Sequence, residues 1–271
     1  MSRTTGGVTY SIVIPVYCSG TWLGELVGRI DAAMRPLAEP FEVILVNDAS
    51  PDAETWPAIE ELSRRHPWVK GIDLLYNAGQ FKAILCGLEQ AAGTYIITMD
   101  DDLQHPPEEL PKLVAAMKAN PEMDCVMGRY EVKSHGMLRN LGSRVLAWAM
   151  THLYGKPRGV TTTSFRIMKR ELAGLLVLYR AARPQLGPLV VRLTRRVMNT
   201  PVEHHARHRG RSGYRPTVMM GEFFQSLINA SIAPLRLVTT IGFLSAFVAF
   251  GLGVWYLVRK LVGGMGVRGY K

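Results

Sequence analysis

The stretch IITMDDDLQHPPEEL, residues 96–110, places Asp100, Asp101 and Asp102 side by side directly after an apolar run. Residues 95–99, YIITM, form a short run that suits a buried strand, and the proline pair before EEL is typical of a helix start. The three aspartates are therefore expected where a strand ends and before a helix begins.

The segments before this stretch alternate between strand-like and helix-like patterns. Buried strands are expected at 10–17, 41–50, 70–77 and 95–99, and helices at 21–34, 53–66 and 79–92. Such alternation predicts an α/β fold with a mainly parallel sheet flanked by helices. Ligands of such sheets bind outside the carboxyl ends of the strands, which is where Asn47, Asp48, Asn77 and the aspartates fall.

The alternation is weaker after residue 125. DCVMGRY (124–130) suggests a strand, and VTTTSFRIMKREL (160–172) suggests a strand followed by a helix. Residues 204–216 are a dense basic loop. We expect a globular domain at residues 1–218 and an amphipathic juxtamembrane segment at 219–236.

An uncharged segment follows at residues 237–258. As a helix it would extend about 33 Å, enough to cross the apolar core of a bilayer. Trp255 and Tyr256 stand near one end, as in an interfacial aromatic belt. We therefore expect a transmembrane helix rather than a buried core helix, followed by a tail at 259–271. Basic residues flank both ends, so this pattern leaves the orientation open.

The composition favours an anionic partner. The chain has 271 residues, a net charge of +10 and 48% hydrophobic residues, which suits one large α/β domain with an appendage. Few aromatic residues stand among the basic ones and no nucleic-acid motif is found, so nucleic acid is not expected as a partner. Cys18, Cys86 and Cys125 match neither a disulfide framework nor a zinc site. No apolar h-region occurs in MSRTTGGVTY, so no cleavable signal peptide is expected.

The aspartates suggest a site for a hard divalent cation. Asp100 and Asp102 have an i, i+2 spacing, so both can lean to one side of the chain, and Asp101 is then expected to point elsewhere without a role. Carboxylates in this arrangement commonly hold Mg²⁺ or Mn²⁺ together with substrate phosphates. The alternative is a solvated acidic turn.

The basic loop supplies a complement. Arg207, Arg209 and Arg211 with two glycines can wrap a pyrophosphate, because guanidinium groups match phosphate oxygens in geometry. The alternative is a solvated or membrane-surface charge patch. Together, the carboxylates and the arginines suggest a nucleoside-diphosphate substrate, with the cation and the arginines stabilising the leaving diphosphate.

Several motifs occur in a familiar order: VIPVY, VNDASPD, NAGQFKAILCGLEQAAGTYIITMDDDLQHPPEEL, SFR, RHRGRSGY and APLRL. In this order the chain resembles family 2 glycosyltransferases of the polyprenyl-phosphate type. It is similar to dolichyl-phosphate mannose synthases, and more so to bacterial undecaprenyl-phosphate transferases of the 4-deoxy-4-formamido-arabinose and phage-type glucosyl groups. The similarity covers roughly residues 10–260, and its segment 77–110 is long and specific.

The resemblance implies a Rossmann-like fold of the glycosyltransferase A type and a Mg²⁺ or Mn²⁺ cofactor. It implies inverting transfer of a sugar from a nucleotide sugar to polyprenyl phosphate, with UDP-sugars favoured over GDP-mannose. It also implies contact with membrane lipid, a role in the cell envelope such as lipopolysaccharide modification, and a homo-oligomer, often a tetramer. Because nucleotide sugars are made in the cytoplasm, we expect the catalytic domain on the cytoplasmic face of the inner membrane.

The resemblance also assigns residues. Near the nucleotide it places Pro15, Tyr17, Asp48 and, less directly, Asn47. In the Asp-x-Asp-x-Gln motif, Asp100 faces the nucleotide sugar, while Asp102 and Gln104 ligate the metal, with Asp100 as a further candidate ligand. The acceptor phosphate is assigned to Arg129, Arg139 and Ser143. The loop that closes over the diphosphate is assigned to Arg207, Gly210, Ser212 and Tyr214.

Some positions depart from the family pattern. Cys18 and Ser19 replace an Asn-Glu pair whose Glu can bind the ribose, so that contact is in doubt. Asp101 and Gly213 also differ from the usual residues, and these changes are expected to affect donor choice. Relatives tend to have two membrane spans, so we expect that a second span is missing here or that the chain is naturally short.

Two other hypotheses remain open. A transferase of the same fold can act on a hydroxyl of a lipid-linked sugar or polysaccharide, although arginines at 129 and 139 favour a phosphate acceptor. A non-catalytic membrane scaffold can bind a nucleotide sugar, although intact Asp100, Asp102, Gln104 and Arg207 argue against a degenerate site.

Overall fold

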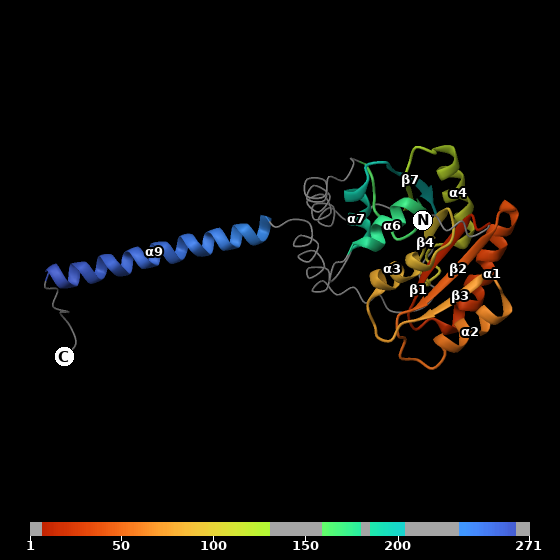
Figure 1. Cartoon of the computed structure of the whole chain (residues 1–271), viewed down its shortest axis with the longest axis horizontal. Helices are drawn as coiled ribbons and strands as arrows, with labels where there is room; N and C mark the ends of the chain where they lie inside the picture. Colours follow the sequence, from red (N-terminus) through yellow and green to blue (C-terminus); the bar gives the residue numbers. More distant parts are fainter. Residues whose placement is uncertain (1–6, 131–158, 180–184, 204–232, 264–271) are drawn as a thin grey trace. The chain divides into compact units, whose positions relative to one another are not determined.

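The computed structural model describes residues 7–130, 159–179, 185–203 and 233–263. The chain divides into two compact units, residues 1–212 and 213–271. The first contains the α/β domain, and the second contains the long helix α9 (Ala233–Gly263) (Figure 1). Each unit is considered by itself.

The described strands of the α/β domain form one sheet in the order β3-β2-β1-β4-β6-β5-β7. Their bounds are β1 Tyr10–Val16, β2 Phe41–Asn47, β3 Val69–Asp73, β4 Tyr95–Thr98, β5 Cys125–Tyr130, β6 Arg166–Lys169 and β7 Val197–Val202. All pairs among β3, β2, β1 and β4 are parallel, β6 is antiparallel to both β4 and β5, and β5 is parallel to β7. The predicted mainly parallel sheet is confirmed, with β6 as the reversed strand.

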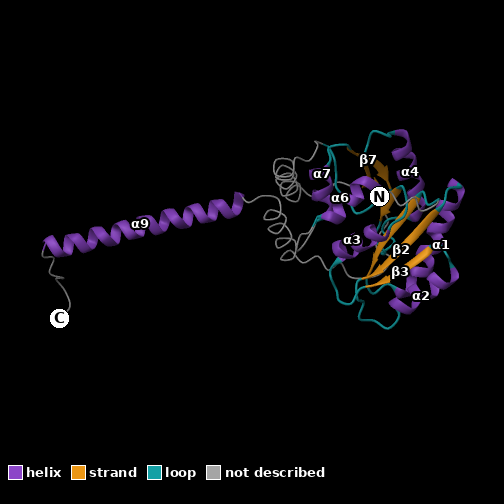
Figure 2. Cartoon of the chain, viewed as in Figure 1, coloured by secondary structure: helices purple, strands orange, loops and turns teal. Residues whose placement is uncertain are grey.

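Helices cover both faces of this sheet (Figure 2). One face packs against α1 (Leu23–Met34), α2 (Thr55–Arg65) and α4 (Leu110–Ala119), and the other against α3 (Gln80–Gln90), α6 (Arg170–Leu178) and α7 (Leu186–Leu193). Short 3-10 turns lie at η1 (Gly20–Trp22), η2 (Arg35–Leu37) and η3 (Pro107–Glu109).

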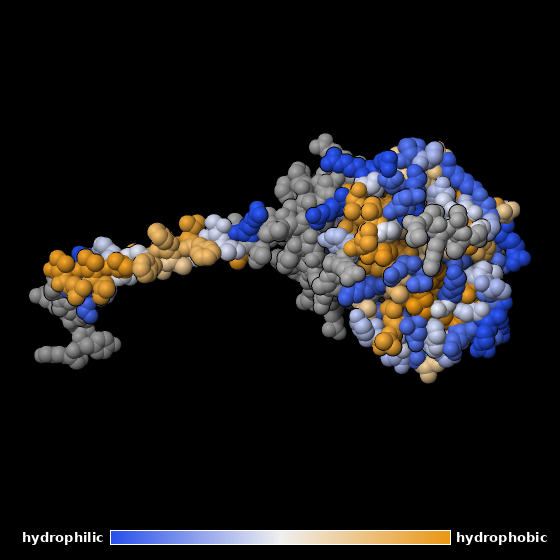
Figure 3. Space-filling model, in the orientation of Figure 1, coloured by the Kyte–Doolittle hydropathy of each residue, from blue (hydrophilic) through white to orange (hydrophobic). Residues whose placement is uncertain are grey.

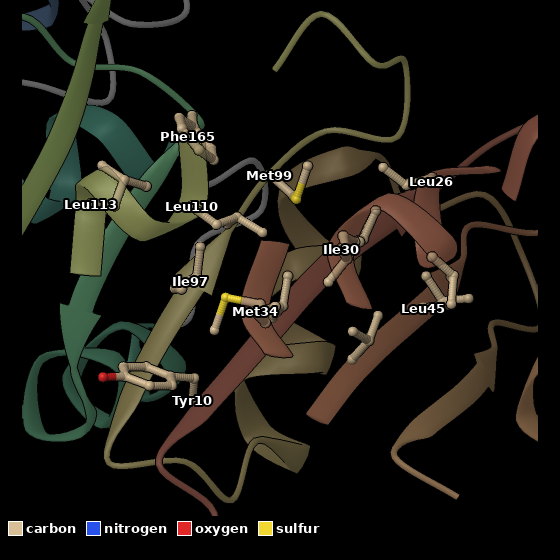
Figure 4. Packing of buried hydrophobic residues seen from close by; sticks show 14 of the residues in the cluster. Tyr10, Leu26, Ile30, Met34, Leu45, Ile97, Met99, Leu110, Leu113 and Phe165 are labelled. Carbon is tan, nitrogen blue, oxygen red and sulfur yellow. The ribbon is translucent and has the colours of Figure 1, made fainter. Parts of the chain in front are cut away.

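The two faces of each strand are apolar because the strands are buried between helices. In β1, Ile12 and Ile14 belong to the cluster under α1 and α4, whereas Val13 between them belongs to the cluster under α3 and α6. Figure 4 shows the first cluster, in which Ile97 and Met99 of the β4 segment are drawn with side chains of α1 and α4. The core therefore packs the end of β4, where the aspartates begin, against α1 and α4 on one face of the sheet.

The elements predicted from the sequence before residue 125 are all present, with bounds shifted by a few residues. The predicted strand at 124–130 is β5, and the predicted strand and helix at 160–172 are β6 and the start of α6. Sequence analysis did not predict α7 or β7, and it gave no sign that β6 runs against its neighbours.

Helix α9 is long and apolar enough to cross a membrane over Val238–Val262. At 1.5 Å per residue this segment extends about 37 Å, which exceeds the apolar thickness of a bilayer. The apolar part of this segment is not buried inside the protein, and its side chains form the apolar surface seen in Figure 3. The predicted apolar span at 237–258 lies within this helix.

Gly87 tests the packing of α3 on the sheet. A Cβ at Gly87 would lie 2.4 Å from Cγ1 of Val13 in β1, whereas a Cβ at Gly28 in α1 would meet nothing within 4 Å. We expect Gly87→Ala to lower the free energy of unfolding by about 1–3 kcal/mol through overpacking. Gly28→Ala should raise it by about 0.5–1 kcal/mol, because alanine restricts the unfolded chain.

Thermal unfolding of both variants in detergent checks this. Equal melting temperatures for Gly87→Ala and the unsubstituted protein would show that α3 does not sit on β1 as described.

Candidate active site

Four strands bring their carboxyl ends to one edge of the sheet, here called the active-site edge. Val16 of β1 lies opposite Asn47 of β2, and the Asp48 amide donates to the Val16 carbonyl over 2.9 Å. Thr98 of β4 and Met127 of β5 both lie opposite Arg166 of β6. Residues that follow these positions in β1, β2, β4 and β5 therefore emerge at the same edge.

Asp48 is buried and holds the turn that starts α3. Its Oδ1 accepts the Ala78 amide over 2.7 Å, and its Oδ2 accepts the Gly79 amide over 2.9 Å. Gly79 has a φ of 89°, a conformation that glycine adopts without strain, so the turn depends on this residue type. Asp48 thereby fixes the position of Gln80, which contacts the acidic motif.

Asn47 ties β2 to its neighbours. Its Nδ2 donates to Asp73 Oδ1 at the end of β3 over 2.7 Å, and its Oδ1 accepts from Ser50 Oγ over 2.6 Å. The Ser50 hydroxyl oxygen in turn accepts the Cys18 amide over 3.0 Å. Asn47 thus connects the loops that follow β1, β2 and β3, beside the position where the resemblance places the nucleotide.

Asp101 joins the loop after β1 to the acidic motif. Its Oδ2 accepts the Tyr17 amide over 3.1 Å and the hydroxyl of Ser19, and its carbonyl oxygen accepts Trp22 Nε1 over 2.7 Å. The Tyr17 side chain is half exposed beside this junction. Sequence analysis assigned Asp101 no role, but its hydrogen bonds connect the loop after β1 to the acidic motif.

The Asp101 carboxyl lies where ionisation is unfavourable. Burial raises the pKa of Asp101 to about 6, against the lowering effect of the donors at Ser19 and Tyr17, and the neighbouring Asp100 and Asp102 raise it further. Burial, more than the neighbouring carboxylates, therefore opposes ionisation of Asp101.

Asp100 is held from two sides. Gln80 Nε2, at the start of α3, donates to its Oδ1 over 2.6 Å, and Ser164 Oγ, just before β6, donates to its Oδ2 over 2.7 Å. Thr98 Oγ1 fixes the Ser164 segment by donating to the Ser164 carbonyl over 2.6 Å. Asp100 is therefore preoriented before any ligand arrives.

Asp102 and Gln104 stand on the next turn. Asp102 Oδ1 accepts the Gln104 amide over 3.1 Å, and Leu103 between them is buried with a φ of 58°. A carboxylate that bonds the backbone two residues on is typical of an Asx turn. The turn carries the side-chain oxygens of Asp100, Asp102 and Gln104, and oxygen is the ligand type that Mg²⁺ and Mn²⁺ prefer.

The oxygen-bearing side chains of Asp100, Asp102 and Gln104 would suit a cation that is bound partly by the protein and partly by a substrate. Among the described residues, no group of three or more His, Cys, Asp and Glu side chains is positioned to hold a metal ion. Two carboxylates and one amide leave coordination positions to be filled by phosphate oxygens or water, which is usual for Mg²⁺ in nucleotide enzymes.

Cationic groups approach from β5 and β6. Arg129 is exposed and stands two residues beyond Met127, as Asp100 stands two beyond Thr98, so both emerge at the active-site edge. Arg166 is 2% exposed, and its Nη1 has no hydrogen-bond partner in the described part of the chain. Burial lowers the pKa of Arg166, and the Asp100 carboxylate acts in the opposite direction. Arg166 thus places a cation behind Asp100.

His105 packs below the same turn. Its ring is 4% exposed and stacks on Phe165 and Tyr130, with centroids 5.2 and 5.6 Å away. Its Nδ1 lies 3.8 Å from Asp100 Oδ2. The stack anchors the acidic turn to β5 and to the segment before β6.

The structure brings together Pro15, Tyr17, Asn47, Asp48, Asp100, Asp102, Gln104 and Arg129 at one edge. Arg139, Ser143, Arg207, Ser212 and Tyr214 lie outside the described residues. Sequence reasoning missed the supporting roles of Gln80, Ser164, Arg166 and His105. The motif SFR gave one signal, because an arginine inside an apolar strand is unusual and points to a specific role.

Comparison with known proteins identifies the class. Residues 11–175 match the family model described as glycosyl transferase family 2, a segment that includes most of β1, the acidic motif and most of α6. The chain therefore belongs to glycosyl transferase family 2 and is an enzyme of the glycosyltransferase class, as the motifs predicted.

Curated relatives are more specific. The chain is 33% identical over 247 residues to the undecaprenyl-phosphate 4-deoxy-4-formamido-L-arabinose transferase of Pseudomonas fluorescens, covering 91% of this chain and 71% of the relative. It is 30% identical over 254 residues to the transferase of the same name from Klebsiella pneumoniae, covering 94% of this chain and 77% of the relative.

Solved structures support the fold. Glucosyl-3-phosphoglycerate synthase from Mycobacterium tuberculosis, in complex with Mn²⁺, UDP and phosphoglyceric acid, superposes with a TM-score of 0.58 at 18% identity, covering 84% of this chain and 78% of that one. S. aureus TarS superposes with a TM-score of 0.51 at 21% identity, covering 74% of this chain and 59% of that one. These likenesses confirm the predicted fold class.

Asp101 gives a pH-dependent prediction. Because the pKa of this carboxyl is raised in the folded protein from 3.8 to about 6, stability falls as the pH rises from about 4 to about 6. Asn keeps an oxygen acceptor for Tyr17 and Ser19 and carries no charge. At pH 7.5 without divalent cations, we therefore expect Asp101→Asn to be up to about 3 kcal/mol more stable than the unsubstituted protein.

The difference should vanish below about pH 4, where both side chains are neutral. Melting temperatures measured in EDTA across this pH range check it, with Asp31→Asn on the surface of α1 as the control. A variant less stable than the unsubstituted protein at pH 7.5 would contradict the assigned electrostatic cost.

Proposed function

We propose that the protein transfers a sugar from a nucleotide-diphosphate sugar to a polyprenyl phosphate, with inversion at the sugar carbon and with a divalent cation. The observation that carries the proposal is the joint position of the Asp100–Asp102 turn and Arg129 at one edge of the sheet. The curated relatives are named for transfer to undecaprenyl phosphate, which favours this acceptor, and the UDP-sugar donor is proposed from the sequence resemblance alone.

The donor end of the reaction needs charge stabilisation. A nucleoside diphosphate leaves with more negative charge than it has in the sugar ester, so groups that stabilise this charge lower the barrier. We assign Mg²⁺ or Mn²⁺ to Asp102 and Gln104, with Asp100 oriented toward the nucleotide sugar by Gln80 and Ser164. The cation, when bound, would stabilise the diphosphate charge.

The acceptor end needs little proton chemistry. A phosphate monoester is already an anion at neutral pH, so it can attack the sugar carbon without a general base. Two anions must nevertheless approach each other, and this is costly without compensating cations. Arg129 is placed to supply one, and Arg139, Ser143 and Arg207 are assigned from the sequence to hold the acceptor phosphate and the diphosphate.

Inversion follows from a single displacement. The acceptor oxygen forms a bond to the sugar carbon while the bond from that carbon to the diphosphate oxygen breaks on the opposite side. The chain's own contribution is alignment, since holding both reactants in line replaces much of the entropic barrier. The support of Asp100 by two donors and of Asp101 by the loop after β1 provides the rigidity that alignment requires.

The membrane supplies the acceptor. Helix α9 is suited to hold the chain in a bilayer, and a polyprenyl phosphate resides there because of its apolar chain. Nucleotide sugars are made in the cytoplasm, so we place the domain on the cytoplasmic face of the inner membrane.

Asp102→Asn tests the cation site. Removing one carboxylate charge from the proposed ligand set should reduce sugar transfer by about a hundredfold or more and weaken metal-dependent donor binding. Transfer of radiolabel from a UDP-sugar, and donor binding titrated with Mn²⁺, are the measurements. Asp31→Asn on α1 is the control, and full activity of Asp102→Asn would refute the assigned site.

Arg139→Ala distinguishes a phosphate acceptor from a sugar hydroxyl. For a phosphate acceptor, loss of the guanidinium should raise the KM for polyprenyl phosphate about tenfold or more and leave the KM for the donor unchanged. Arg64→Ala, which removes a surface ion pair on α2, serves as control. An unchanged acceptor KM would favour a hydroxyl acceptor.

A further inference from the structure

Among the large apolar side chains that are exposed on the described part of the α/β domain, six lie in three segments whose ends point to the active-site edge, and none of the six is used in the proposed chemistry. They are Leu75, Tyr76, Phe81, Leu175, Leu178 and Tyr179, with exposed fractions from 38% for Phe81 and Tyr179 to 101% for Leu75. We call this set the apolar rim. Exposed leucine and aromatic side chains that lie toward the same end of a domain are candidates for a contact surface.

The first three rim residues lie at the active-site edge. Leu75 and Tyr76 protrude between two anchored positions, because the Leu74 amide donates to the Asn47 carbonyl over 3.0 Å and Asn77 Nδ2 donates to the Asp48 carbonyl over 3.2 Å. Phe81 is the second residue of α3, directly after Gln80, whose side chain holds Asp100.

The other three reach the same edge from the opposite direction. The amide and Nε of Arg170 donate to the carbonyls of Thr94 and Gly93, so α6 begins at the edge of the sheet far from the active site. Helix α6 packs against α3 and therefore runs back toward the active-site edge. Leu175, Leu178 and Tyr179 lie along its last turn and just beyond.

The acidic residues of α3 and α6 lie at the helix ends away from the active-site edge. In α3 the only carboxylate is Glu89, in the last turn, and in α6 it is Glu171, in the first turn. Both helices thus place their acidic residues at the far edge and their exposed apolar residues toward the active site. The charged residue of α3 that is closest in sequence to Phe81 is the cation Lys82. The two helices thus bring apolar and aromatic side chains and one cation toward the active-site edge and add no carboxylate to it, a pattern that suits the interfacial zone of a bilayer. The edge itself carries carboxylates, including those of Asp73 and of the acidic turn.

The chain itself brings such a bilayer within reach. Helix α9 is suited to cross a membrane, and it belongs to the same chain as the rim. Figure 3 shows apolar surface over the part of the domain that α6 occupies in Figure 1. The proposed acceptor also carries its reactive phosphate at the membrane surface, so an active site that opens there must have a face that tolerates lipid.

We propose that the apolar rim inserts into the headgroup zone of the membrane and orients the active-site edge toward the lipid phosphate. The proposal rests on the proposed function for its benefit to catalysis, but insertion of the rim is a separate physical statement. The anchor in α9 would keep the domain near the bilayer, and the rim would select which edge of the sheet faces it.

Insertion is tested with the full chain in vesicles of phosphatidylethanolamine and phosphatidylglycerol. In a Cys18→Ser, Cys86→Ser background, Leu178→Cys carries a bimane label, and doxyl-labelled phospholipid is the quencher. Leu193→Cys is the matched control, since Leu193 is also exposed but lies beside Thr194, whose hydroxyl bonds Asp124 at the far edge. We expect strong quenching at 178 and little at 193.

Equal quenching at the two positions would overturn the proposal, as would a label at 178 that is shielded from lipid by another segment of the chain or by a second copy.

Catalysis provides a second test. The pair Leu75→Glu and Leu178→Glu should lower kcat/KM for undecaprenyl phosphate in vesicles by about tenfold or more, because charged side chains oppose insertion. Transfer to a short-chain polyprenyl phosphate soluble in detergent should be unchanged, and Leu193→Glu should change neither. An equal loss with both acceptors would overturn the proposal. Absence of transfer by the unsubstituted protein would refute the proposed function, while the quenching result would still decide insertion.

Discussion

The arrangement of the site depends on crowding of negative charge at the end of β4. Three adjacent carboxylates repel one another, and the fold offsets this by giving each a different set of donors. Asp100 is bonded by Gln80 and Ser164, Asp101 by the loop after β1, and Asp102 by the Gln104 amide. These donors come from elements far apart in the sequence, so the acidic turn is also where β1, α3 and the segment before β6 are joined.

In the same arrangement, negative charge of the acidic turn remains available to a ligand. The donors on Asp101 are neutral, and Arg166 stands behind Asp100 without an ion pair at 4 Å or less among the described residues. Binding of a divalent cation together with a diphosphate would neutralise carboxylate charge of the acidic turn. The contacts that make the turn rigid are therefore compatible with the cation site proposed for it.

The placement of the polar residues at the end of β2 and of the aspartates at one edge of the sheet could be predicted from the sequence, because the strands were recognisable by their apolar runs and parallel strands end together. The supporting contacts could not. Tyr17 and Asp101 are 84 positions apart, and no local pattern records their hydrogen bond. Pro201 argues against a strand, and β7 was not predicted. In the structure β7 is the outermost strand of the sheet, where proline is tolerated. Arg166 was not singled out because arginine is seldom buried.

The central claim is tested most directly by following a labelled sugar into lipid. The purified full chain, with Mn²⁺ and undecaprenyl phosphate, would be offered UDP-glucose, UDP-galactose, UDP-N-acetylglucosamine, UDP-4-deoxy-4-formamido-arabinose and GDP-mannose in turn. The account predicts that label from a UDP-sugar enters a lipid-extractable product that mild acid releases, and that EDTA prevents this. Metal-dependent nucleotide binding without a lipid-linked product from any of these donors would contradict it.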